Sequence, residues 1–368
     1  MAFIKKENLH EIVGMFFITR LAIFTIGFFS ALVIIKNSWF GGTNSLIDLF
    51  FRWDSNWYLS IVNDGFLYIP DKMSNVNFFP LYPLLVKIFS LGVFEPKVIG
   101  FVISNISLLV AIIYLYKLVR TDFKEKVSLR AVFYMLICPV SFFFSIFYTE
   151  GLFLGLAIPC FYYARKGKWF AASCLGFFVS LTKIVGILIF IPLLVEYLMQ
   201  KNQGRFKIKN IKKDFFCLLL VPLGLLLHML YLQLKFGDFL AFYHMQKNGW
   251  NTYLTSPLTT LRGIGYFNEF YQILYLGAII VALILIAYGI FAKIPLSYSI
   301  YSLILMFAYL SKNNIDSIAR YIGVLFPIYI SLAIIGTKSK IWDIFLTIFS
   351  IMLLALYVII FVNGYWAT

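Results

Sequence analysis

Long apolar runs recur along the whole chain and constrain its fold more than any other feature. Of the 368 residues, 62% are hydrophobic and only 13% are charged, whereas soluble domains are about half apolar and a quarter charged. The excess is not confined to one segment, so it does not come from a single anchor on a soluble body. We therefore expect an all-α, polytopic membrane protein.

The apolar runs and the charged breaks between them predict about 11 transmembrane helices. The first run follows two lysines and is too long for a signal peptide, so we expect it to be a retained span. The chain has no internal repeat, and a single domain over residues 1–368 is predicted. The predicted spans are 14–35, 98–119, 131–147, 150–165, 169–182, 184–200, 215–234, 272–292, 296–311, 320–336 and 341–363.

The distribution of charged residues predicts how the spans are oriented in the membrane. The net charge of +15 has no soluble basic domain to carry it, so nucleic acid is not an expected partner. With the N-terminus inside, the basic residues gather in cytosolic loops such as 117–130, 165–168 and 201–213, as the positive-inside rule requires. This topology places two long loops, 36–97 and 235–271, on the outer face. Loops of this length are usually functional.

Aromatic residues in the first outer loop follow a helical spacing. Leu46, Phe50, Trp53, Trp57 and Ile61 recur every three to four residues, which predicts an amphipathic helix in the membrane interface. Several common chemistries lack their motifs: there is no P-loop, no Gly-x-Ser-x-Gly and no His-Glu-x-x-His. The four cysteines and three histidines show no metal-ligand spacing, so we expect no metal site. His228 is expected to be a core residue.

Asp54 is the strongest candidate for a catalytic residue. The segment 51–58 reads Phe-Arg-Trp-Asp-Ser-Asn-Trp-Tyr, and it places this carboxylate between two tryptophans near the membrane surface. A carboxylate at a desolvated edge can act as a general base. The alternative is that Asp54 pairs locally with Arg52 or caps a turn.

The segment 51–58, followed by Phe-Phe-Pro-Leu-Tyr-Pro at 78–83, resembles the PIG-V family of mannosyltransferases. These are GT-C-type integral membrane glycosyltransferases. Weaker resemblances follow in the same order: Tyr-Thr-Glu at 148–150, Thr-Lys-x-x-Gly at 182–186, and Gly-Asp at 237–238 with Gln246 and Trp250. Arg-Tyr at 320–321 completes the series. Lys183 stands where the family usually has Arg, and Phe239 where it has Pro.

The resemblance implies a GT-C-like fold and a reaction. A polyprenyl-phosphate sugar, typically dolichyl-phosphate mannose in eukaryotes, would donate its sugar at the outer face of the membrane, with inversion of the anomeric carbon. The acceptor hydroxyl would belong to a glycolipid, a polymer or a protein. Asp54 would be the base, and a compact chain of this kind fits a prokaryotic plasma membrane. Asp54 and Glu150 could share a divalent cation, although no ligand spacing in the sequence requires one.

Cations are expected near the leaving phosphate. Arg320 and Lys183 both fall on the outer side of the predicted topology and are the candidates for donor-phosphate binding. Arg320 could instead be a surface residue paired with Asp316, and Lys183 could be an ordinary lysine at the end of a span.

The remaining candidates are expected in supporting or acceptor-binding roles. Glu150 could bind acceptor hydroxyls, or it could only complement the dipole at the start of a helix. The second loop could be an interfacial helix with ordinary polar residues. The supporting set is Arg52, Trp53, Glu150, Asp238, Gln246 and Trp250.

A transporter or flippase of lipid-linked sugars is the main alternative. It would need inverted repeats or paired broken helices near the bilayer midplane, and the sequence shows neither. A scaffold subunit that only positions another enzyme would leave the segment around Asp54 without a purpose.

Overall fold

The structure, a computed structural model, describes residues 4–34, 45–201 and 211–367. This part of the chain is helical and contains no β-strand, only an isolated bridge between Leu254 and Lys312. The α-helices are α1 (Lys6–Val33), α2 (Leu46–Leu49), α3 (Asp54–Asp64), α4 (Leu81–Ser90), α5 (Pro96–Val119), α6 (Glu125–Leu136), α7 (Glu150–Arg165), α8 (Trp169–Ser180), α9 (Phe190–Lys201), α10 (Leu220–Phe236), α11 (Ala241–His244), α12 (Pro257–Gly263), α13 (Glu269–Phe291), α14 (Leu296–Leu310), α15 (Ile318–Gly323), α16 (Pro327–Lys338) and α17 (Lys340–Val362).

Six helical segments in the described ranges are long and apolar enough to cross a membrane. Two of them join a 3₁₀ segment to an α-helix: η3 (Ile184–Ile189) continues into α9, and η4 (Lys213–Leu219) continues into α10. Shorter apolar helices pack among them. The chain is therefore a multi-pass membrane protein, while the expected number of 11 spans stays a prediction. The six segments are Lys6–Val33, Pro96–Val119, Ile184–Lys201, Lys213–Phe236, Glu269–Phe291 and Lys340–Val362.

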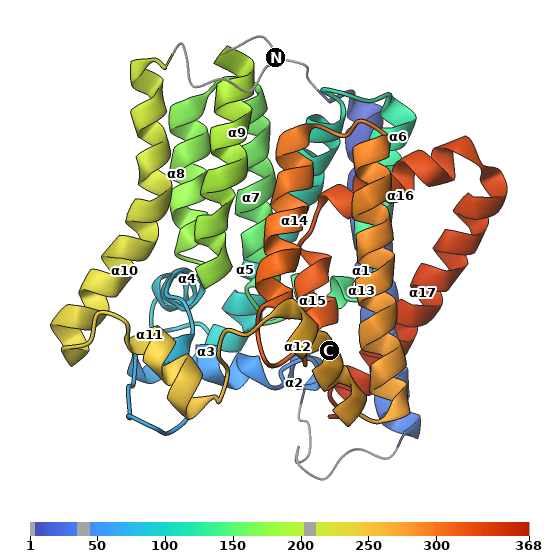
Figure 1. Cartoon of the computed structure of the whole chain (residues 1–368). Helices are drawn as coiled ribbons and strands as arrows, with labels where there is room; N and C mark the ends of the chain where they lie inside the picture. The colour runs from blue at the N-terminus through green and yellow to red at the C-terminus, as the bar shows by residue number, and fades with distance from the viewer. Residues whose placement is uncertain (1–3, 35–44, 202–210, 368) are drawn as a thin grey trace.

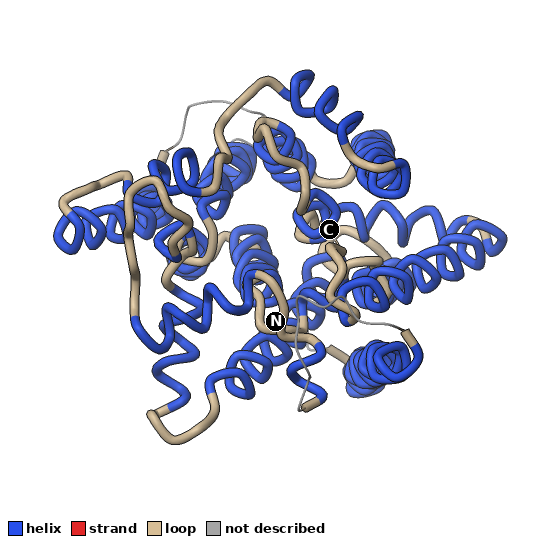
Figure 2. Tube along the Cα trace, turned by 90° about the horizontal axis from the view of Figure 1, so that it is seen from below, coloured by secondary structure: helices blue, strands red, loops and turns tan. Residues whose placement is uncertain are grey.

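The long helices stand side by side, and several short ones gather at one end of the bundle. Figure 1 shows α2, α3, α11 and α12 at the lower end, and Figure 2 views that end from below, with some of the long helices seen nearly end-on. Helix α1 starts at the upper end, whereas α17 finishes at the lower end. The lower end therefore holds the described parts of both long loops predicted from the sequence.

Two predicted spans are not continuous helices. In the predicted span 131–147, α6 ends at Leu136, before Pro139, and the chain continues through a short 3₁₀ turn. In the predicted span 320–336, α15 and α16 are separated just before Pro327. Proline lacks an N–H and disfavours a helical residue before it, so each break lies where a proline interrupts the apolar run.

Buried Arg20 supports the first of these breaks. Its Nη2 donates to the carbonyl of Leu136 at 2.7 Å, and its Nη1 donates to the carbonyl of Ser141 at 2.9 Å. Carbonyls freed by a broken helix need donors when water is excluded. Arg20, a charged residue within a long apolar helix, therefore stabilises the irregular segment that leads to Glu150.

The predicted amphipathic helix through residues 46–61 is interrupted. Helix α2 ends at Leu49, and α3 begins only at Asp54. Phe50 is buried in the core rather than lying in the membrane interface. Trp53, at φ 50° and ψ −114°, reverses the chain between the two helices. Both segments with the aromatic spacing are helical, but the turn at 50–53 separates α2 from α3 and gives the two helices different surroundings.

Glycines bring α5 and α7 into close contact. A Cβ atom at Gly151 would lie 2.9 Å from the carbonyl oxygen of Ser104, and one at Gly155 would lie 2.6 Å from that of Ser107. Small residues four apart allow this approach between membrane helices. The contact fixes the start of α7, and with it the position of Glu150.

Candidate functional site

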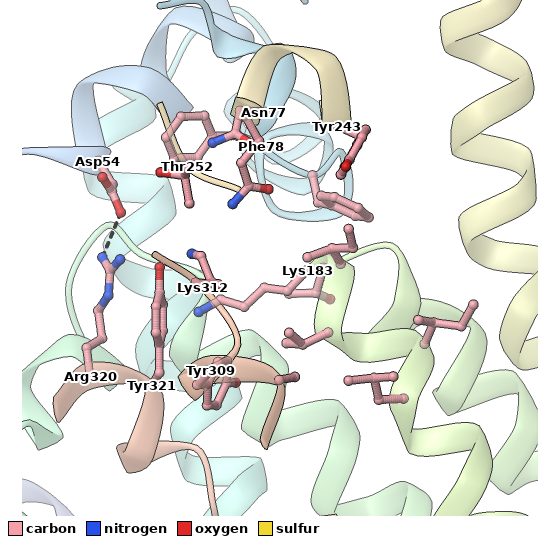
Figure 3. Close-up of a pocket in the computed structure, with 18 of the residues that line it drawn as sticks. Asp54, Asn77, Phe78, Lys183, Tyr243, Thr252, Tyr309, Lys312, Arg320 and Tyr321 are labelled. Carbon is pink, nitrogen blue, oxygen red and sulfur yellow. Dashed lines mark hydrogen bonds and ion pairs between the residues drawn. The ribbon is translucent and has the colours of Figure 1, made fainter. Parts of the chain in front are cut away.

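A cavity of about 330 Å³ opens near the lower end of the bundle. Its wall is built by α3, the start of α7, the 3₁₀ segment η3, the second long loop, the end of α14 and α15. Its volume is at the lower end of the range for small-molecule sites. Five charged side chains line it: Asp54, Glu150, Lys183, Lys312 and Arg320. Figure 3 labels all of these except Glu150.

Asp54 is the first residue of α3, and the turn before it is tightly held. The amide of Ser55 donates to the carbonyl of Arg52 at 3.1 Å, which closes the turn around Trp53. The hydroxyl of Tyr148 accepts from the Asp54 amide at 3.3 Å and donates to the Arg52 carbonyl at 3.1 Å. A non-glycine residue with positive φ costs about 1–3 kcal/mol. The backbone of Trp53, directly before the candidate base Asp54, is therefore strained.

Arg320 is the ion-pair partner of Asp54. Its Nη1 donates to Asp54 Oδ2 at 2.7 Å, across 266 residues of sequence (Figure 3). The Arg320 side chain is 8% exposed and that of Asp54 20%. The guanidinium carbon lies 5.1 Å from the centre of the Tyr148 ring and 5.2 Å from that of Tyr321. The structure therefore contradicts the alternative that Arg320 pairs with Asp316.

Glu150 is the most deeply buried charged residue of the cavity, with 1% of its side chain exposed. Its Oε1 accepts a hydrogen bond from Lys183 Nζ and lies 3.5 Å from Arg320 Nε. Within the described chain its other oxygen, Oε2, has no hydrogen-bond partner. The two carboxylates and their two cations therefore form one connected network, with Arg320 between Asp54 and Glu150.

Lys312 is a cavity residue that the sequence analysis missed. Its ammonium lies 5.2 Å from the centre of the Tyr321 ring, and that of Lys183 lies 5.7 Å from the same ring. Lys312 directly follows the predicted span 296–311 and shares the loop that leads to Arg320. Its place at a span end on the same side as Arg320 is the signal that could have identified it.

Of the supporting residues, Gln246 lines the cavity together with Glu150, whereas four others do not. Arg52 donates to the carbonyl of Val362 at 3.3 Å. The ring of Trp53 meets that of Trp366 edge-on, with centres 4.8 Å apart. Both residues thus connect the turn before Asp54 to the C-terminal segment.

Asp238 and Trp250 hold the second long loop in place. Asp238 Oδ2 accepts from Tyr68 at 3.0 Å and lies 2.8 Å from His244 Nδ1. Burial acts to raise the pKa of Asp238, but hydrogen bonds from His244, the Leu240 amide and Tyr68 outweigh it and lower the pKa. The indole of Trp250 donates to the carbonyl of Ser74 at 3.3 Å.

Nothing in the described part of the chain gathers three or more His, Cys, Asp or Glu residues as a metal site would. The acidic residues of the cavity are Asp54 and Glu150, and Arg320 lies between them. A divalent cation shared by these carboxylates would have to displace Arg320. His228 is buried among aromatic rings, as expected for a core residue.

Comparisons of the chain with known proteins give matches at the level of structure. No protein-family model and no curated protein matches the sequence. The crystal structure of ArnT from Cupriavidus metallidurans bound to undecaprenyl phosphate matches with a TM-score of 0.52 and 13% identity, over 87% of this chain and 60% of that one. An oligosaccharyltransferase from Archaeoglobus fulgidus, tethered to an acceptor peptide, matches with a TM-score of 0.49 and 14% identity, over 94% and 55%.

These structural neighbours are GT-C-type glycosyltransferases. The match to ArnT supports the expected GT-C-like fold, and at 13% identity it concerns the fold alone. The chain spans 60% of the length of ArnT. The resemblance to the PIG-V family stays a prediction.

Proposed function

We propose that the chain is a glycosyltransferase that takes a sugar, mannose by its resemblance to the PIG-V family, from a polyprenyl-phosphate donor. The observation that carries the proposal is the Asp54–Arg320 pair at the wall of a cavity lined by three cations. A base next to a positively charged cavity suits a reaction in which a hydroxyl is deprotonated and a phosphate leaves. The GT-C-like fold supports the same reaction class.

Asp54 is suited to the role of base because one of its oxygens remains available. Arg320 donates to Oδ2, and no hydrogen bond to Oδ1 is found among the described residues. A carboxylate oxygen that accepts no hydrogen bond from the protein is free to accept one from an acceptor hydroxyl. Arg320 also holds the orientation of the carboxylate, so Oδ1 would face the acceptor.

The proposed transfer is a single displacement. The acceptor hydroxyl gives its proton to Asp54 Oδ1, and its oxygen forms a bond to the anomeric carbon. The bond between that carbon and the phosphate oxygen breaks, and its electron pair stays on the polyprenyl phosphate. The cations of the cavity stabilise the charge that develops there. Because attack and departure occur on opposite faces, the configuration inverts.

The aromatic wall would hold the sugar. Tyr58, Phe78 and Tyr309 line the cavity together with Asn77 and Gln246. Flat apolar rings with a few amides offer a stacking surface and hydrogen bonds for a hydroxylated ring. We propose that Gln246 binds sugar hydroxyls, and that the lower end of the bundle faces the outside of the membrane.

The direct test is Asp54→Asn in a transfer assay. The purified full chain in lipid nanodiscs would receive radiolabelled dolichyl-phosphate mannose and a panel of glycolipid and peptide acceptors. We expect a loss of about 10²- to 10⁴-fold in turnover, the usual contribution of a positioned base. Asp64→Asn, at the exposed far end of the same helix, is the matched control and should keep full turnover.

Near-wild-type turnover of Asp54→Asn would refute the role of the base. Movement of the labelled lipid across the bilayer without any new glycosidic bond would instead favour the flippase. Transfer with retention of configuration at the anomeric carbon, measured by NMR of the product, would exclude the single displacement.

A further inference from the structure

The charges of the cavity do not balance. Both carboxylates already have cationic partners, because Asp54 pairs with Arg320, and Glu150 pairs with Lys183. Lys312 lines the same cavity and forms no ion pair with any described carboxylate. Asp316 lies in the same loop as Lys312 and interacts electrostatically with it, but the two side chains form no ion pair. The three cations and two carboxylates leave one positive charge in surplus.

Lys312 is held in place through its backbone. Its loop forms an isolated bridge with the second long loop, in which Thr255 donates to the Ser311 carbonyl at 2.9 Å and Asn313 donates to the Tyr253 carbonyl at 3.0 Å. The hydroxyl of Thr260 donates to the Lys312 carbonyl at 2.7 Å. The main chain is thus fixed on both sides, while the side chain reaches into the cavity.

Figure 3 shows the side chains of Lys312 and Lys183 extending into the same space, beside the ring of Tyr321. The two cations differ in what they have left to bind. Lys183 already donates to Glu150, whereas the ammonium of Lys312 lies against the Tyr321 ring and forms no hydrogen bond or ion pair with the described residues. An ammonium in a partly desolvated cavity gains most from an incoming anion when no carboxylate competes for it.

We propose that Lys312 binds the phosphate of the lipid-linked donor, and that the cavity selects a donor with a single negative charge. The proposal rests on the proposed function. A sugar joined to a lipid through one phosphate is a phosphodiester with one negative charge, which matches the single surplus cation. A diphosphate carries at least one more negative charge and would need a second unpaired cation.

This proposal changes the expected roles of Arg320 and Lys183. The sequence alone suggested that they bind the donor phosphate. Their contacts with Asp54 and Glu150 make them positioning residues, which hold the two carboxylates in the cavity wall. The positive charges of Arg320 and Lys183 still contribute to the electrostatic field at the donor phosphate, but Lys312 is the residue proposed to contact it directly.

The test is a binding measurement that needs no turnover. The full chain in phosphatidylcholine nanodiscs is titrated with farnesyl methyl phosphate, a lipid phosphodiester without a sugar. Lys312→Gln should weaken its binding by about 10- to 100-fold, the loss expected for one charge-assisted hydrogen bond. Lys312→Arg should restore most of it, and Lys247→Gln, an exposed lysine of the second loop, should leave it unchanged.

The wild-type protein provides a second measurement that does not depend on the stability of a variant. It should bind farnesyl methyl phosphate more tightly than farnesyl methyl diphosphate in metal-free buffer. Tighter binding of the diphosphate would overturn the selection of a monoanion. Displacement of the probe by an equal concentration of phosphatidylglycerol would show a general phospholipid site and would overturn the assignment to the donor.

Transfer assays separate this proposal from the proposed function. Asp54-dependent transfer with an unchanged donor KM in Lys312→Gln would overturn the role of Lys312 and leave the glycosyltransferase intact. Binding that depends on Lys312 without any transfer would refute the glycosyltransferase and leave the anion site.

Discussion

Replacing Glu150 with glutamine should weaken the fold while leaving the anion site functional. Glu150 is 1% exposed, and its Oε1 faces both Lys183 and Arg320. The substitution keeps the shape of the side chain but removes one of the two negative charges in the cavity. Lys183 is 15% exposed and Arg320 is 8% exposed, so water can replace little of the lost interaction.

Removing one partner of a buried ion pair costs about 3–5 kcal/mol. We expect a loss near the lower end, about 3 kcal/mol, because glutamine keeps an oxygen that can accept from Lys183. Adding Lys183→Gln to Glu150→Gln should recover part of the loss, since it removes the unpaired cation. Contacting residues show coupling of about 0.5–3 kcal/mol in such cycles.

The assay is the free energy of unfolding in mixed detergent micelles, measured for both single variants, the double variant and the wild type. The matched control is Glu269→Gln, because Glu269 is also the first residue of a helix but is exposed. It should lose only about 0.3–1 kcal/mol, the contribution of a carboxylate to the helix dipole. Equal losses for Glu150→Gln and Glu269→Gln would refute the buried network and support the helix-dipole role.

Binding gives the second readout. The positive surplus of the cavity rises by one unit in Glu150→Gln, so farnesyl methyl phosphate should bind at least as tightly as it does to the wild type. Weaker binding in a folded variant would show that Glu150 organises the anion site, which the contacts of Lys312 do not predict.

Two further predictions concern packing and pH. Gly155→Ala should destabilise the protein by about 1–3 kcal/mol through overpacking, since the new Cβ would lie 2.6 Å from the Ser107 carbonyl oxygen. The control is Gly14→Ala, because Gly14 has open space around it. Thermal unfolding compares the two variants, and equal melting temperatures would contradict the close contact between α5 and α7. The lowered pKa of Asp238 in the folded state adds stability that is complete above its ordinary pKa of about 3.9 and is lost as the pH falls through the lower folded value. Asp238→Asn should therefore flatten the pH dependence of unfolding in that acidic range, whereas Asp64→Asn should not; an unchanged profile in Asp238→Asn would refute the contribution.

The class of the protein could be read from local sequence because the bilayer acts on each segment separately. An apolar run of about 20 residues is enough to cross the membrane, whatever its neighbours do. The six long segments, from Lys6–Val33 to Lys340–Val362, each coincide with a predicted span. The breaks at Leu136 and before Pro327 were missed because apolar residues continue through them. Their freed backbone groups depend on distant partners such as Arg20.

The sequence by itself determined the candidate chemistry, since Asp54, Glu150, Lys183 and Arg320 stand out as charges in apolar surroundings. Only the tertiary structure decided how they pair. Asp54 and Arg320 are 266 residues apart, and their hydrogen bond joins the first residue of α3 to α15. Lys312 became a candidate only once the neighbouring cations were seen to be paired. Charge balance is a property of side chains in contact, and no local pattern of residues specifies it.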